Sequence, residues 1–261
     1  MLNEPAAGMR RWALLLEYHG GGYAGWQRQQ GQVTLQSVLE DAASRLVGGM
    51  PVGSVAAGRT DAGVHASGQV AMLDLPERFG ANQVRDALNF HMGRHAMAVL
   101  LAAPVPEGWN PRFSATGRAY EYRILNRPAR PVLERGRVWH LGLPLDEAAM
   151  NAGAALLLGQ HDFTSFRAAS CQAKSPLRTL DRLQVVRDGP MLTVFAEARS
   201  FLHHQVRNLV GTLKLVGEGR WPPERVAAVL AARDRAAAGP TAPPDGLTLC
   251  RVSYDPDPFS R

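Results

Sequence analysis

The sequence predicts an α+β fold made of two β-α-β-β-α-β halves, the ferredoxin-like or RRM-like arrangement. Their strands are expected to form one extended, mainly antiparallel sheet with helices behind it. Two observations favour this fold. Strand-like and helix-like apolar periods follow one another in that order, and the later part of the chain repeats the order with insertions. Asp188-Gly189, between two strand-like runs, is a strong hairpin signal and indicates antiparallel pairing.

The first half contains the elements of one such unit. Thr34 is placed to cap a helix whose apolar residues recur at helical spacing and stop at Gly48. The glycine-rich segment 20–32 before it predicts a loop. The other expected elements are strands at 10–18, 52–57, 69–75 and 96–105 and a helix at 83–90.

The second half repeats this order without any visible repeat of residues. The expected elements are strands at 118–125, 138–142 and 247–255, a hairpin over 179–199, and helices at 145–159, 201–217 and 222–234. We therefore expect two α+β domains, residues 1–113 and 114–261. An open sheet face of this kind suits RNA.

The composition narrows the class of protein. With 46% hydrophobic and 20% charged residues, the 261-residue chain can bury a proper core. No signal peptide is expected, and no apolar run approaches the roughly 20 residues that a membrane span needs. The two cysteines, Cys171 and Cys250, are too few for a disulfide framework. A reducing, cytoplasmic compartment is therefore expected.

The charge of the chain favours an anionic partner. The net charge is +6, and only Lys174 and Lys214 among the 29 basic residues are lysines. Arginine grips phosphate with a planar fork of donors, although a biased genome composition would explain the global excess equally well. The segment 117–137 holds six arginines against two glutamates. A local basic stripe of this kind is typical of nucleic-acid binding.

The stretch Gly58–Gln69, GRTDAGVHASGQ, is the strongest candidate for chemistry. Asp61 follows a predicted strand, and Gly58 and Gly63 give the backbone unusual freedom around it. An aspartate between glycines is commonly a turn residue that caps backbone amides. A plain hairpin loop needs only one polar turn residue, however, and this loop also concentrates other polar and charged side chains. Asp61 is therefore either a turn residue or a reactive carboxylate.

Six motifs in this sequence resemble, in order, those of the transfer RNA pseudouridine synthases of the TruA family. The resemblance covers nearly the whole chain, from about Leu15 to Tyr254. The motifs are GGGYAGWQRQ, GRTDAGVHA, RFSATGRAYEYRI, GQHDFTSFR, FLHHQVRNLVGTL and DGLTLCRVSY. The resemblance implies isomerisation of uridine to pseudouridine in the anticodon arm of transfer RNA by a homodimer.

The resemblance assigns three catalytic residues. Asp61 matches the catalytic aspartate, which either adds to the uracil ring or captures the anomeric carbon of the ribose. Arg207 matches the arginine that pairs with that aspartate, and a cation of this kind offsets the effect of burial on a carboxylate. Tyr120 matches a tyrosine that stacks on the target base and removes a proton late in the reaction. On pattern alone, a strand aromatic packed in the core is the favoured interpretation of Tyr120.

Further residues are expected to touch the substrate. Leu247 matches an apolar pocket wall, and His65 either supports the Asp61 loop or contacts RNA. The target uridine must leave its stack before reaction, and Arg59 is placed to fill the vacated space or to hold the flipped phosphate. His203 is expected in a structural or RNA-contacting role.

The chemistry needs no cofactor and no metal, because no redox change or phosphate energy is involved. The sequence carries no P-loop, dinucleotide or CxxC motif. His203 and His204 are expected on a helix, where adjacent side chains point in different directions, so no zinc site is expected with Cys171.

Two departures from the family pattern affect local RNA contacts and the dimer rather than the chemistry. His19 replaces an acidic residue after Tyr18, and the stretch around Phe90–Ala96 lacks the usual Leu-Pro and Asp-Ile pairs. Two other functions remain as alternatives. The first is a non-catalytic RNA-binding protein, and the second is a glycoside hydrolase, for which no second carboxylate stands out.

Overall fold

The structure is a computed structural model that describes residues 5–260. Residues 1–4 and 261, the ends of the two expected domains, lie outside the described residues. The described chain divides into two compact units. The first unit contains the residues up to Thr116 and those from Leu249 onward, and the second unit is Gly117–Thr248. The chain crosses between the two units twice, after Thr116 and after Thr248, and each crossing falls within a strand.

The first unit has the expected β-α-β-β-α-β order. Its elements are β1 (Met9–Tyr18), α1 (Leu35–Leu46), β2 (Ser54–Ala56), β3 (His65–Pro76), α2 (Ala81–Met92) and β4 (Met97–Pro104), joined by most of β10 (Leu247–Tyr254). The strand order is β4-β1-β3-β10, with β2 on β3. The pairings β1–β3, β1–β4 and β2–β3 are all antiparallel.

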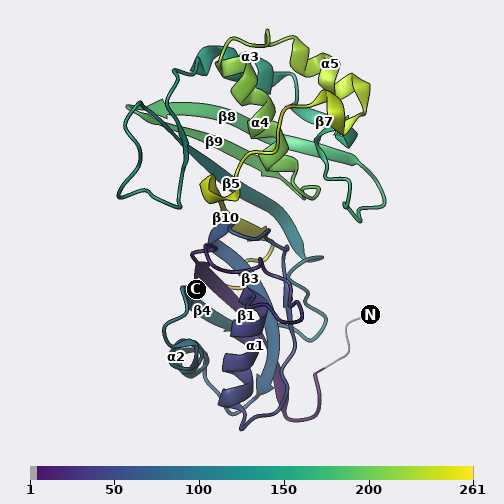
Figure 1. The fold of residues 1–261 in the computed structure, drawn as a ribbon. Helices are drawn as coiled ribbons and strands as arrows, with labels where there is room; N and C mark the ends of the chain where they lie inside the picture. The colour runs from purple at the N-terminus through teal and green to yellow at the C-terminus, as the bar shows by residue number, and fades with distance from the viewer. Residues whose placement is uncertain (1–4, 261) are drawn as a thin grey trace. The chain divides into compact units, whose positions relative to one another are not determined.

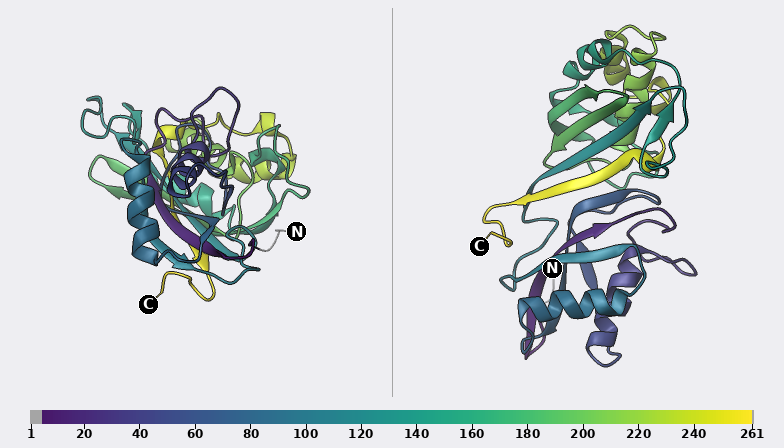
Figure 2. Two further views of the ribbon diagram at one scale, coloured as in Figure 1. Left: turned by 90° about the horizontal axis from the view of Figure 1, so that it is seen from below. Right: turned by 90° about the vertical axis from the view of Figure 1, so that its left-hand side faces the viewer.

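The core of the first unit lies between the sheet and its two helices. Trp12, Leu14 and Leu16 alternate along β1 and are almost fully buried. The helices α1 and α2 lie side by side (Figures 1 and 2) and bury apolar faces that include Leu39 and Leu88. Thr34 caps α1, as expected, by accepting a hydrogen bond from the Ser37 amide.

The second unit contains further strands of the ten-stranded sheet together with three α-helices. Its elements are β5 (Ala115–Asn126), β6 (Trp139–Leu141), α3 (Glu147–Ala155), β7 (Gly159–Asp162), η1 (Thr164–Phe166), β8 (Leu177–Asp188), β9 (Met191–Ala198), α4 (Gln205–Gly217), α5 (Arg225–Ala232), η2 (Arg235–Ala237) and η3 (Pro244–Gly246). The strand order is β5-β9-β8-β7, with antiparallel pairs β5–β9, β8–β9 and β7–β8. The short strand β6 differs from these strands, because it pairs with β5 in a parallel arrangement.

Burial along β9 shows that one face of the strands of the second unit is covered. Leu192, Val194 and Ala196 are fully buried, whereas the residues between them are half exposed. Figure 1 shows α3, α4 and α5 gathered on one side of these strands. The opposite face carries Arg182, whose guanidinium lies 4.6 Å from the ring centre of Phe195.

The expected fold class is confirmed as mixed α+β with a large, mainly antiparallel sheet. Three expected helices are shorter than predicted, among them α5, which covers Arg225–Ala232 of the expected 222–234. The helix α3 ends at Ala155, and Gly159, whose φ of +89° is incompatible with an α-helix, begins strand β7 at the end of the expected helical segment. His204 has φ +62°, so α4 begins at Gln205 instead of 201. In the described part of the chain, none of the helices has the length and apolar character needed to cross a membrane.

Replacing Gly68 by alanine tests the close packing of β3 against β10. A Cβ atom at Gly68 would lie 2.1 Å from the carbonyl oxygen of Cys250, a backbone atom that cannot swing aside. We expect Gly68→Ala to lower the free energy of unfolding by about 1–3 kcal/mol, as measured by urea denaturation.

Gly53→Ala is the matched control, because a Cβ there has no neighbour within 4 Å. It should change the free energy of unfolding by no more than about 0.5 kcal/mol. Equal stability of the two variants would contradict the packing described for Gly68.

Candidate active site

The GRTDAGVHA motif forms the loop between β2 and β3 in the first unit. Asp61 is half-buried in this loop, and Arg59 is exposed. Gly63 has φ +82°, a left-handed conformation that favours glycine. The amide of Val64 donates a 3.1 Å hydrogen bond to the Asp61 carbonyl, which closes the turn. The loop therefore presents the Asp61 carboxylate from a fixed turn in the backbone.

A buried hydrogen-bonded network holds this loop on the sheet. The hydroxyls of Tyr18 and Thr60 lie 2.9 Å apart. The side-chain amide of Gln69 donates to the Tyr18 hydroxyl at 3.3 Å and to the Gly58 carbonyl at 2.8 Å. Thr60 and Gln69 are 6% and 0% exposed, so these bonds are shielded from water. Gly58 and Thr60, which precede Asp61 in the loop, are consequently tied to β1 and β3.

The glycine-rich loop before α1 packs against the same turn. A Cβ atom at Gly25 would lie 2.8 Å from the Thr60 carbonyl oxygen, and one at Gly20 would lie 2.0 Å from the Val64 carbonyl oxygen. The amide of Trp26 donates to the Thr60 carbonyl at 3.0 Å. Only residues without a side chain allow this close approach, which explains Gly20 and Gly25 of the GGGYAGW motif.

His65 is the first residue of β3 and is almost completely buried. Its Nδ1 accepts a 3.0 Å hydrogen bond from the Gly20 amide, and its ring centre lies 4.4 Å from that of His19. Of the two roles expected for His65, these contacts favour support of the loop. Contact with RNA remains a prediction.

Tyr120 lies on β5 of the second unit, opposite Ala196 of β9. Its side chain is half-buried, and its ring meets the ring of Phe201 edge-on at 5.2 Å. It shares a strand face with Tyr122, which is fully buried. Tyr120 is thus at the accessible end of a row of core residues, where its ring is held in orientation by Phe201.

Arg207 lies in the first turn of α4 and is fixed by the segment that leads to β10. Its Nε donates to the Ala242 carbonyl at 2.8 Å, and the Ala242 amide donates to the Arg207 carbonyl at 3.1 Å. Burial raises the pKa of Tyr122, and the positive charge of Arg207 opposes that rise. The guanidinium therefore lies close enough to the buried Tyr122 of β5 to affect the pKa of its hydroxyl. Leu247, a few residues beyond Ala242, is 5% exposed.

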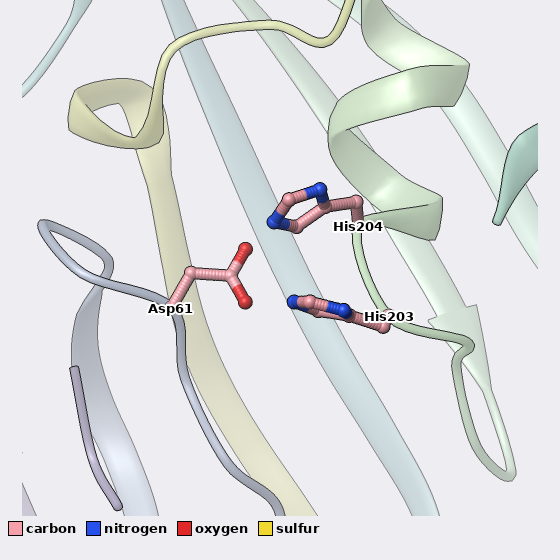
Figure 3. A group of neighbouring side chains, drawn as sticks. All are labelled: Asp61, His203 and His204. Carbon is pink, nitrogen blue, oxygen red and sulfur yellow. The ribbon is translucent and has the colours of Figure 1, made fainter. Parts of the chain in front are cut away.

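The expectation that His203 and His204 lie on one helix with diverging side chains is wrong. Both residues precede α4, and the left-handed backbone of His204 brings their ring centres to 4.0 Å at an angle of 46°. His203 is exposed, and its Nδ1 lies 3.3 Å from the Ser170 hydroxyl. Figure 3 draws the two histidines of the second unit and Asp61 of the first. The absence of a metal remains a prediction.

Comparison with known proteins decides the family. The family model described as tRNA pseudouridine synthase matches residues 15–114 and 154–255. The chain is 68% identical to tRNA pseudouridine synthase A of Acidiphilium cryptum over 97% of this chain and all of that protein. It is 54% identical to the Gluconobacter oxydans protein of the same name, over 100% of this chain and 96% of the other.

The chain belongs to the tRNA pseudouridine synthase family.

Enzymes of this family isomerise uridine to pseudouridine. In this synthase, the matched regions contain Asp61, Arg207 and Leu247. Tyr120 falls in the unmatched segment 115–153, so its assignment depends on the RAYEY motif alone.

Sequence reasoning missed the residues that hold the site of the synthase together. Gln69 carries a signal, because it is polar and stands at the start of an otherwise apolar strand. A polar residue there must find partners, and it finds Gly58 and Tyr18. Ala242 carries no signal, since its backbone and not its side chain binds Arg207.

The network predicts a loss of stability in alkali. Burial raises the pKa of Tyr18 to about 12, although the hydrogen bonds with Thr60 and Gln69 oppose the rise. An unfolded tyrosine ionises near pH 10, so the folded protein holds this proton more tightly. The stabilisation is complete below about pH 10 and is lost between about pH 10 and pH 12, by at most about 1.4 kcal/mol per pH unit.

The variant Tyr18→Phe isolates this contribution. Near neutral pH, we expect it to be less stable than the wild type by about 1–2 kcal/mol, because Thr60 and Gln69 lose a buried partner. Urea unfolding across the alkaline range should show that the gap between the two proteins narrows as pH rises. A constant gap would contradict the shifted ionisation of Tyr18.

Proposed function

We propose that this synthase isomerises neighbouring uridines in the anticodon arm of transfer RNA, with Asp61 as nucleophile. The observation that carries the proposal is the construction of the Asp61 loop. Gly58 and Thr60, which precede Asp61, are held by hydrogen bonds of a buried network, whereas Asp61 itself is only half-buried. A simple turn aspartate would not require this support from β1, β3 and the glycine-rich loop.

The proposed reaction is an isomerisation in which atoms balance without a co-reactant. The glycosidic N–C bond of uridine breaks, the uracil rotates, and a C–C bond forms between uracil C5 and the ribose. The hydrogen on C5 leaves as a proton, and the freed ring nitrogen gains one. Asp61 forms a transient covalent bond either with the uracil ring or with the anomeric carbon, and its release completes the cycle.

The other roles in this proposal come from the resemblance of the motifs. Arg207 is the cation that pairs with Asp61, Tyr120 stacks on the base and removes the late proton, and Leu247 lines the pocket. Arg59 is proposed to occupy the space left by the flipped uridine, and its exposure leaves it accessible to RNA. His203 is proposed as an RNA contact, which its exposure also permits.

Further aspects of the proposal concern the assembly and its location. By the same resemblance, we propose a homodimer that acts on transfer RNA in the cytoplasm without a cofactor or metal. A basic protein that grips phosphates should bind transfer RNA less tightly as the salt concentration rises.

Tritium release from transfer RNA that carries 5-tritiated uridine tests the nucleophile. The wild type should release tritium, because the C5 hydrogen is lost when the new C–C bond forms. Asp61→Asn should release none above background while still binding transfer RNA, because the amide is a poor nucleophile of nearly the same shape. Asp86→Asn is the matched control, since Asp86 is an exposed aspartate of α2 that pairs with Arg85. It should release tritium like the wild type.

Each remaining outcome would decide against part of the proposal. Tritium release that survives Asp61→Asn would overturn the nucleophile assignment. Binding without any release by the wild type would favour the alternative of a non-catalytic RNA-binding protein.

A further inference from the structure

The first unit contains a groove apart from the Asp61 loop. It has a volume of about 700 Å³ and lies between segment 28–33, one face of α1 and the end of α2. Its charged or titratable lining residues are Arg28, Asp41, Arg45, His91 and His95. Arg45 lies in the last turn of α1, and both His91 and His95 belong to the stretch that departs from the family pattern.

The groove offers an exposed cation, Arg45, although the charges of Arg28, Arg45, Glu40 and Asp41 in and beside it sum to zero. The guanidinium of Arg28 is engaged, because it pairs with two carboxylates, those of Glu40 and Asp41, at 2.9 Å each. Within residues 5–260, the exposed side chain of Arg45 has neither a salt bridge nor a side-chain hydrogen bond. Arg45 is therefore available to an outside anion, and the imidazoles of His91 and His95 add further donors.

An exposed aromatic ring stands beside the groove. Phe90 is 79% exposed, an unusual position for a phenylalanine, and its ring meets that of His91 edge-on at 5.3 Å. Basic side chains next to an accessible aromatic face are typical of surfaces that bind single-stranded or looped RNA. Gln30 and Gln32 line the same groove with amides, which can bind phosphate and ribose oxygens.

One loop joins this groove to the turn that carries Asp61. At one end, the Tyr23 hydroxyl accepts a 2.9 Å hydrogen bond from the Ala96 amide, next to His95. Further along, the Trp26 amide donates to the Thr60 carbonyl at 3.0 Å. The groove and the Asp61 loop therefore belong to one connected structure within the first unit.

We propose that this groove binds a phosphate–ribose segment of the transfer RNA substrate away from the uridine that is isomerised, with a base stacked on Phe90. The inference rests on the proposed function for the identity of the RNA. Two observations support this occupant. Arg45 is an exposed cation without a salt bridge among the described residues, and the loop of Tyr23 and Trp26 joins the groove to the turn that carries Asp61. Arg45 and Phe90 would hold the RNA body while the Asp61 loop receives the flipped uridine.

Filter binding of an unmodified transfer RNA transcript over a range of salt concentrations tests the groove. Arg45→Gln should weaken binding about tenfold and lower the slope of log affinity against log salt by about one, because one phosphate contact is lost. Phe90→Ala should weaken binding by a similar factor, about tenfold, without changing the slope, since stacking releases no counterion. In the tritium assay, both variants should show a raised KM for transfer RNA.

Arg78→Gln is the control, because it removes an equal charge from an exposed arginine of the same unit that does not line the groove. The inference is overturned if Arg45→Gln binds transfer RNA with the affinity and salt slope of Arg78→Gln. It is also overturned if inorganic phosphate at millimolar concentration abolishes the difference between wild type and Arg45→Gln, which would indicate a site for a small anion. Failure of the proposed function would appear separately, as a wild type that binds the transcript but releases no tritium.

Discussion

The hydrogen bonds among Tyr18, Thr60 and Gln69 are the constraint on which the candidate site depends. They lie at the junction of β1, β3 and the Asp61 loop, where water cannot compete with them. In that environment an unmade bond is costly, so the loop has one favourable arrangement. The half-buried side chain of Asp61 can then approach a substrate without reorganisation of its backbone.

Close backbone packing adds a second constraint of the same kind. Gly20 and Gly25 let the glycine-rich loop approach the Asp61 loop at distances that exclude a Cβ atom. In the second unit, two hydrogen bonds between Arg207 and the Ala242 backbone, one of them from the Arg207 side chain, likewise fix the start of α4 against the segment before β10. Both units thus position polar side chains through contacts with main-chain atoms. Such contacts tolerate little change in the position of the backbone.

The sequence predicted some of this organisation well, for physical reasons. Periodicity and turn chemistry are local properties, so the element order of the first unit and the hairpin at Asp188-Gly189 could be read directly. The candidate Asp61 could be found because its loop is chemically unusual. The start of α4 could not be predicted, since a positive φ at His204 is rare for a residue with a side chain. The contact between Arg207 and Ala242 joins residues far apart in the chain through a carbonyl, which no residue pattern reveals.

The single-turnover rate of Thr60→Val with saturating transfer RNA tests most directly whether the buried network prepares Asp61 for reaction. Valine keeps the shape of threonine and removes only the hydroxyl that meets Tyr18. The account predicts a folded protein whose rate constant falls by about tenfold to a hundredfold, because the Asp61 loop loses its fixed position. A folded Thr60→Val protein that reacts at the wild-type rate would contradict it.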